Sequence, residues 1–120
     1  DEAYNTALRF CIEQYERVAS CNASHNAESA LLQAQLIVER GIPRNHPNLY
    51  FCQLYGMSDN LTYNLAASGF NAAKYVVYGS VREVVPYLIR RAQENSSVTG
   101  DMSREYRLVA DEIKRRGLKM

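Results

Sequence analysis

The chain has 120 residues, 47% of them hydrophobic and 22% charged, a composition that allows one small domain with a buried core. Its formal net charge is only +1, so no overall field attracts nucleic acid or an anionic membrane surface. No apolar run approaches the roughly 18 residues that a transmembrane helix needs, and no signal peptide is visible. We therefore expect neither a nucleic-acid partner nor a transmembrane segment.

The first half of the chain alternates helical and strand-like patterns. Apolar residues recur three and four positions apart within 4–15, which predicts an amphipathic helix. Residues 17–22 resemble a short strand, and 27–38 carry a second helical stripe that Gly41 is expected to stop. The compact apolar run at 49–54 has the length of a buried strand.

A third helix and a third strand follow. Ser58 or Asp59 is suited to cap a helix that runs to about Ser68 and ends at Gly69. Residues 73–78 are rich in tyrosine and valine, which predicts a strand.

The last part of the chain is predicted to be helical. Ser80 and Glu83 have capping-box spacing, so a helix should begin at Val81. The polar segment 95–101 is expected to break this helix, and Ser103 is expected to cap a last one.

Strands that alternate with helices are parallel and are joined by right-handed crossovers. The predicted fold class is α/β. Because three parallel strands leave open edges, we expect part of a larger α/β barrel, with about three parallel βα units plus flanking helices; the resemblance described below makes this the C-terminal portion of a (β/α)8 TIM-type barrel. Residues 1–120 would form one partial barrel. The chain begins without methionine, which suggests a piece of a longer protein, and its open edges favour self-association.

The three cysteines are Cys11, Cys21 and Cys52. Their number is odd and no CxxC motif occurs, so we expect buried free thiols in a reducing compartment. Neither His25 nor His46 has metal-ligand spacing to them, and no metal site is expected.

Ser24, His25 and Asn26 follow the first predicted strand and open a helix. Backbone amides at a helix N-terminus attract phosphate, and the histidine and asparagine side chains add donors. The alternative is an asparagine cap beside an ordinary loop histidine. The end of the second strand, with Leu54 beside Tyr55, is either the wall of a small apolar pocket or a packed strand that leads into a glycine turn.

Tyr87, Arg91 and Glu94 are spaced to share one face of the helix that begins at Val81. Arg90 points roughly 100° away from Arg91. Guanidinium groups suit a carboxylate ligand because they stay charged and donate two hydrogen bonds. The alternative is an exposed basic helix with an ordinary Arg–Glu pair.

Four motifs together resemble proline dehydrogenase. They are Ala-Ser-His-Asn at 23–26, Gln-Leu-Tyr-Gly-Met at 53–57, Lys-Tyr-Val-Val-Tyr-Gly at 74–79 and Tyr-Leu-Ile-Arg-Arg-Ala-Gln-Glu-Asn at 87–95. Their order and spacing match the C-terminal part of that family's catalytic domain, and the resemblance covers about residues 4–118. The arginine motif is the most specific of the four.

The resemblance implies a (β/α)8 barrel with FAD at its C-terminal face. The family oxidises L-proline to 1-pyrroline-5-carboxylate by hydride transfer to the flavin, in proline catabolism, and electrons usually pass to a membrane quinone. The implied location is cytoplasmic or peripheral at the inner membrane, which is mitochondrial in a eukaryotic source.

The motifs also imply roles for particular residues. Those that bind the substrate would be Arg90 and Arg91 at the carboxylate and Tyr75, Tyr87 and Leu54 around the ring. Those that contact the flavin cofactor would be Ser24, His25, Asn26 and, at its far part, Glu94. No side chain is assigned as catalytic, because the flavin carries the hydride.

The chain departs from the family in two ways. Val77 stands where the family often has proline, and the earlier strands, which carry further flavin contacts, a carboxylate-binding lysine and an acidic residue, lie outside this sequence. We therefore expect the 120 residues alone to bind FAD poorly and to be inactive. The alternatives are a hydroxyproline dehydrogenase or a non-catalytic, self-associating half-barrel module.

Overall fold

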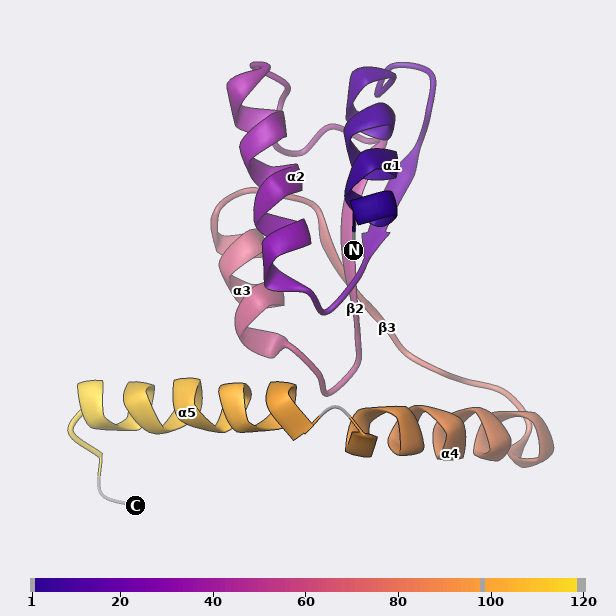
Figure 1. Cartoon of the computed structure of the whole chain (residues 1–120), viewed down its shortest axis with the longest axis vertical. Coiled ribbons are helices and arrows are strands. Elements are labelled where there is room, and N and C mark those ends of the chain that lie inside the picture. Colours follow the sequence, from indigo (N-terminus) through magenta and orange to yellow (C-terminus); the bar gives the residue numbers. More distant parts are fainter. Residues whose placement is uncertain (1, 98, 119–120) are drawn as a thin grey trace. The chain divides into compact units, whose positions relative to one another are not determined.

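The computed structural model describes residues 2–97 and 99–118, and within these ranges residues 95–105 are described by their backbone alone (Figure 1). The chain divides into two compact units, Asp1–Val76 and Val77–Met120, each considered by itself. The first unit contains α1 (Glu2–Glu13), β1 (Ser20–Ala23), α2 (Ala27–Glu39), β2 (Leu49–Leu54), α3 (Asp59–Ala67) and β3 (Ala72–Tyr75). The second unit contains α4 (Val81–Ser97) and α5 (Thr99–Arg115).

The first unit is built on a three-stranded sheet in the order β1-β2-β3, with both pairs parallel. The helices α2 and α3 connect successive strands (Figure 1). The predicted parallel βα units are therefore present. Sequential parallel strands are consistent with a sector of an α/β barrel, and three of them do not close one.

Two strand boundaries differ from the prediction. β1 begins at Ser20 and not at residue 17, because Arg17 and Val18 donate to the carbonyl of Gln14 and continue the turn that follows α1. β3 ends at Tyr75 and not at residue 78. Its partner strand β2 ends opposite Tyr75, so the β-forming residues that follow have no strand to pair with.

The core lies on the face of the sheet that carries Leu49 and Phe51, both 1% exposed. It is formed by the buried residues Ile12, Ala30, Leu36, Ile37, Ile42, Leu49, Phe51, Leu65 and Phe70. The alternate strand positions point to the opposite face, where Tyr50 is 42% and Tyr75 is 51% exposed.

The cysteines are free, as predicted, but they are not buried. Cys21 is exposed, and Cys11 and Cys52 are half-buried. Cys21 and Cys52 occupy strand positions that alternate with those of the buried Asn22 and Phe51, so they lie on the opposite, open face of the sheet.

The predicted stop at Gly41 is confirmed. Gly41 has a φ of +66°, which glycine adopts without strain. Its amide donates to Val38 at 3.1 Å and the amide of Ile42 donates to Ile37 at 3.0 Å, which is the Schellman pattern.

In the second unit, α4 begins at Val81 as predicted, and the Ser80 hydroxyl donates to the Glu83 carboxylate at 3.0 Å. The predicted break falls within 95–101, where α4 ends at Ser97 and α5 begins at Thr99, but it is shorter than the predicted segment. Ser103 therefore lies within α5 and does not cap it.

Among the described helices, none combines the length and the apolar character that crossing a membrane requires.

Candidate functional site

The C-terminal ends of the three strands meet at one edge of the sheet, because the strands are parallel. Leu54 and Tyr75 are paired in register at the ends of β2 and β3. The β1 end is joined to the same edge by Gln53, whose Nε2 donates to the carbonyl of Ser24 at 3.2 Å. The parallel strand order that the sequence predicted therefore brings these strand ends to one edge within the first unit.

Asn26 caps α2. Its Oδ1 accepts hydrogen bonds from the amides of Glu28 at 2.9 Å and Ser29 at 3.3 Å. The Ser24 Oγ in turn accepts from the amide of Asn26 at 3.0 Å. The capping alternative is thus correct for the Asn26 oxygen, which leaves the amide Nδ2 as the donor with which this side chain can bind a ligand.

His25 is not an isolated loop histidine. Its Nδ1 lies 2.9 Å from the Oγ of Ser58, the residue before α3, although the two are 33 positions apart in sequence. This contact joins the loop after β1 to the loop after β2 and fixes one nitrogen of the ring.

Gln53 is 2% exposed and links three elements. Besides its bond to Ser24, its Oε1 accepts from the hydroxyl of Thr62 in α3 at 2.9 Å. A buried amide that is satisfied on both sides stiffens its surroundings. Gln53 therefore holds the loop after β1, the strand β2 and the helix α3 in a fixed relation.

Sequence reasoning missed Lys74, which it treated only as part of a motif. The Nζ of Lys74 makes an ion pair with the Oδ1 of Asp59 at 2.7 Å and donates to the carbonyls of Leu54 and Met57. The available signal was strand alternation, because a lysine two positions after the small Ala72 falls on the buried face of a short strand, where an ammonium needs acceptors.

The arginine motif lies on α4 in the second unit. Arg91 is half-buried and pairs with Glu94 at 2.7 Å, while its guanidinium carbon lies 5.2 Å from the ring centroid of Tyr87. The predicted common face of these three residues is confirmed, and so is the ordinary Arg–Glu pair named as its alternative. The buried Arg91 Nε makes no hydrogen bond within the described part of the chain, and Arg90 is exposed.

The predicted site residues therefore form two groups. Ser24, His25, Asn26, Leu54 and Tyr75 lie at the sheet edge of the first unit. Tyr87, Arg90, Arg91 and Glu94 lie on α4 in the second. Convergence of the two groups on one ligand stays a prediction.

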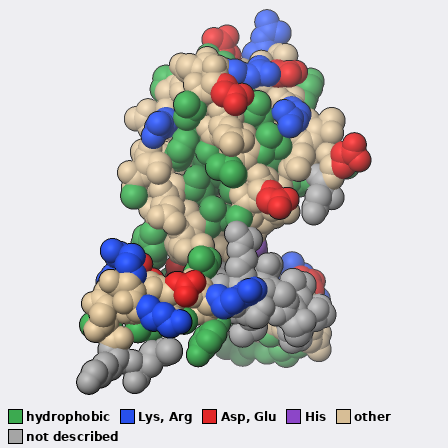
Figure 2. Space-filling model, turned by 60° about the vertical axis from the view of Figure 1, so that its left-hand side comes forward, with side chains coloured by type: hydrophobic (Ala, Val, Ile, Leu, Met, Phe, Trp, Pro, Cys, Tyr) green, Lys and Arg blue, Asp and Glu red, His purple; other side chains and the backbone are tan. Residues whose placement is uncertain are grey.

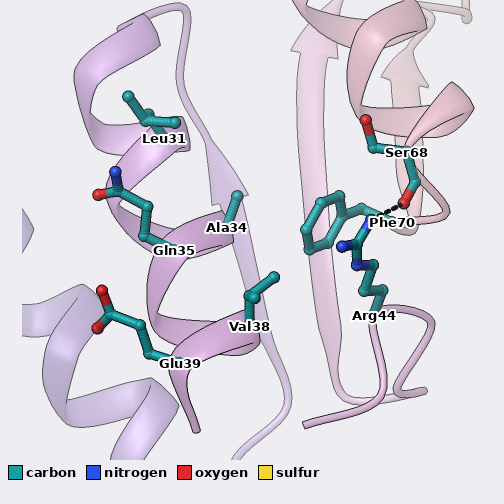
Figure 3. Close-up of a pocket in the computed structure, with 8 residues that line it drawn as sticks. All are labelled: Leu31, Ala34, Gln35, Val38, Glu39, Arg44, Ser68 and Phe70. Carbon is teal, nitrogen blue, oxygen red and sulfur yellow. Dashed lines mark hydrogen bonds between the residues drawn. The ribbon is translucent and has the colours of Figure 1, made fainter. Parts of the chain in front are cut away.

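A separate groove of about 350 Å³ lies in the first unit beside α2 (Figure 3). At its far wall, Arg44 stacks over the Phe70 ring at 5.4 Å and donates to the Ser68 carbonyl at 2.8 Å. Leu31 and Val38 are 58% and 50% exposed, and Figure 2 shows hydrophobic side chains among polar ones on the surface of this unit. None of the predicted site residues lines this groove.

Across the described residues, no group of three or more histidine, cysteine, aspartate or glutamate side chains is placed to bind a metal ion.

Comparison with known proteins identifies the family. The family model described as "Proline dehydrogenase" matches residues 1–104. The chain is 39% identical over 118 residues to "Proline dehydrogenase 2, mitochondrial" of Arabidopsis thaliana, covering 96% of this chain and 25% of the relative. It is 42% identical over 120 residues to "Proline dehydrogenase 1, mitochondrial" of Dictyostelium discoideum, covering 96% of this chain and 21% of the relative.

A differently named relative matches equally well. "Hydroxyproline dehydrogenase" of Bos taurus is 40% identical over 119 residues, covering 96% of this chain and 26% of the relative. The chain thus spans about a quarter of the length of these relatives. No solved structure matches it significantly.

Proposed function

The chain belongs to the proline dehydrogenase family, and we propose that it is the C-terminal part of a catalytic barrel that oxidises L-proline to 1-pyrroline-5-carboxylate with FAD. The proposal is supported by the family match over residues 1–104 and by relatives about four times as long. Within the chain, the observation that carries it is the arrangement of Tyr87, Arg91 and Glu94 on α4.

The Arg91 guanidinium is preorganised to bind a planar anion such as a carboxylate. The Glu94 carboxylate and the Tyr87 ring hold its guanidinium in one orientation, which lowers the conformational entropy lost when a ligand binds. Its Nε keeps an unused donor among the described contacts. We assign Arg91 and the exposed Arg90 to the proline carboxylate, with Tyr87, Tyr75 and Leu54 around the ring.

The residues assigned to the flavin present suitable groups. The Asn26 amide, the Ser24 hydroxyl and the His25 ring gather at the N-terminus of α2, where backbone amides favour an anionic ligand. We assign Glu94, through its position beside Arg91, to the far part of the cofactor. When bound, FAD supplies the hydride acceptor, and the protein supplies orientation and exclusion of water.

The proposed electron acceptor and cellular location rest on the same proposal of a proline-oxidising enzyme. We propose a membrane quinone as electron acceptor and a peripheral position at the inner membrane. Relatives from Arabidopsis and Dictyostelium carry "mitochondrial" in their names, which favours that compartment if the source is eukaryotic.

A second candidate substrate is hydroxyproline. The observation that favours it is the 40% identity to a hydroxyproline dehydrogenase, which lies between the 39% and 42% identities to the two proline dehydrogenases. The ratio of kcat/KM for the two imino acids would decide between them.

Arg91→Lys in the longer enzyme tests the carboxylate role. Lysine keeps the charge but loses the two-donor geometry and the stacking on Tyr87. Loss of one charged hydrogen bond costs roughly 1.5–3 kcal/mol, so KM for proline should rise about tenfold to a hundredfold while flavin content stays the same. Arg82→Lys, at an exposed position of the same helix, is the matched control. An unchanged KM in the Arg91 variant would refute the assignment.

The 120-residue chain itself gives a simpler test. We expect it to purify without a flavin spectrum and to self-associate through the open edges of β1 and β3. A stoichiometric flavin spectrum, or a monomer by light scattering at high concentration, would contradict these two expectations respectively.

A further inference from the structure

Lys74 in β3 makes several polar contacts to which no role has yet been assigned. Its side chain is 19% exposed and its Nζ meets Asp59 at 2.7 Å, the Leu54 carbonyl at 3.4 Å and the Met57 carbonyl. An ammonium has three donors and no acceptor, so these three oxygens match its capacity. A guanidinium, which is planar and forked, cannot reproduce this arrangement.

The segment that Lys74 holds is the loop between β2 and α3. Gly56 has a φ of +77° and Ser58 a φ of +49°, the latter an uncommon conformation for a residue other than glycine. Within the loop, the amide of Met57 donates to Leu54 at 3.1 Å. Such a backbone persists only where surrounding contacts determine it, and Lys74 supplies contacts at both ends of the loop.

The position of Lys74 also links two predicted pocket walls. Gln53 is paired in register with Lys74, and Leu54 is paired with Tyr75. Because successive side chains alternate between the faces, Lys74 works from the core face while Leu54 and Tyr75 lie on the other. Lys74 directly precedes Tyr75 in β3, and its ammonium donates to the backbone carbonyl of Leu54 in β2. It therefore connects the two residues that are predicted to line the pocket.

We propose that Lys74 is a positioning residue for the imino-acid substrate. By anchoring the loop after β2, it sets how Leu54 stands beside Tyr75 and so tunes the fit of the five-membered ring. The substrate part of this inference rests on the proposed function, whereas the anchoring of the loop does not.

The anchoring is tested on the 120-residue chain by amide hydrogen exchange. Lys74→Met keeps the length of the side chain and removes its donors. The amides of Tyr55 and Met57 should exchange at least about tenfold faster, while the β1 amides stay unchanged. Lys114→Met, at an exposed position of α5, is the control. Unchanged exchange at Tyr55 and Met57 would overturn the anchoring role.

A second variant distinguishes loss of the Lys74 contacts from general misfolding. Asp59→Asn removes the charge partner and leaves Lys74 and both carbonyl contacts in place. It should give a smaller acceleration at the same two amides than Lys74→Met gives. An equal or larger acceleration would mean that the ion pair, and not the lysine hub, holds the loop.

The substrate role is tested in the flavin-loaded longer enzyme. Lys74→Met should raise KM for proline about tenfold with kcat within about twofold, and Lys74→Arg should recover only part of this loss. A merely structural defect lowers the fraction of active enzyme, which reduces the apparent kcat and leaves KM unchanged. An unchanged KM would overturn the inference even where hydrogen exchange confirms the loop anchor. Failure of the unmodified enzyme to oxidise proline would overturn the proposed function, and the substrate part with it.

Discussion

The Nδ1 of His25 and the Oγ of Ser58 lie 2.9 Å apart, which joins the loop after β1 to the first residue before α3. Ser58, one of the two capping residues that the sequence suggested, occupies the N-cap position of α3, yet its side chain makes no capping bond. Ser58 has a φ of +49°, and its hydroxyl contacts His25 instead. The Ser58 side chain therefore contacts the loop after β1 and does not cap α3.

The positive φ of Ser58 predicts that the glycine variant at position 58 is more stable than the alanine variant, the reverse of the usual order. Both substitutions remove the hydroxyl, but only Ser58→Gly also removes the strain of a positive φ, which costs an L-residue about 1–2 kcal/mol. Ser58→Gly should therefore be more stable than Ser58→Ala by about 1 kcal/mol in urea denaturation followed by circular dichroism.

The control for this prediction is Ser68, whose φ is −82°. There the order should reverse, because glycine gains nothing from an ordinary backbone conformation and loses more entropy on folding. If alanine is as stable as glycine at position 58, the strain at Ser58 is absent in solution.

The parts of the fold that were predictable are those that depend on local sequence. The bounds of β2 and the start of α4 at Val81 follow from an apolar run and a capping box, both of which act over a few residues. The end of β3 was not predictable, because Val76 and Val77 favour strand but find no partner beyond the end of β2. Strand limits depend on the neighbouring strand, which periodicity does not reveal.

The same distinction holds for the candidate site. The pairing of Arg91 with Glu94 and its stacking on Tyr87 could be read from helical spacing. The contacts of Lys74 and His25 could not, because their partners lie far away in sequence, between the end of β2 and the start of α3. Polar contacts across a sheet edge require the register, which the sequence alone leaves open.

Asn26 has two roles that one substitution can separate. Asn26→Ala removes the α2 cap and should lower the free energy of unfolding by about 1 kcal/mol. Asn26→Asp keeps an oxygen that can cap, and its charge suits the positive helix end, so stability should be retained. In the longer enzyme, Asn26→Asp should nevertheless weaken flavin binding, because it removes the amide donor.

The measurements for Asn26 are urea denaturation of the 120-residue chain and the ratio of flavin to protein in the longer enzyme. Asn64→Ala, at an exposed position within α3, is the matched control and should not lower stability. Full flavin content in Asn26→Asp would show that Asn26 serves only as a cap.

Cys21 should react slowly for an exposed thiol. Partial burial raises its pKa, and the charge and hydrogen bond of Cys52 raise it further, so less thiolate is present at neutral pH. Alkylation by iodoacetamide near pH 7.5, followed by peptide mass spectrometry, should be slower at Cys21 than in free cysteine. Cys52→Ala removes two of the three causes and should accelerate it. An unchanged rate at Cys21 would mean that the two thiols do not interact.

Glu112 near the end of α5 should titrate far below an ordinary glutamate. Its carboxylate accepts hydrogen bonds from Arg115 at 2.6 and 2.7 Å and from Arg116 at 2.7 Å, which lowers its pKa to about 2 from 4.5. A depressed folded-state pKa contributes stability that is present above the unfolded-state value and is lost as the pH falls through the folded-state value. The helical signal of α5 should therefore weaken between about pH 4.5 and 2.

The carboxyl carbon shift of Glu112, followed by NMR, should show a midpoint near 2 at low salt. Because these groups are exposed, added salt should move the midpoint upward, and Glu112→Gln should abolish the acid transition of the helix end. A midpoint near 4.5 at low salt would show that the two arginines do not hold the carboxylate in solution.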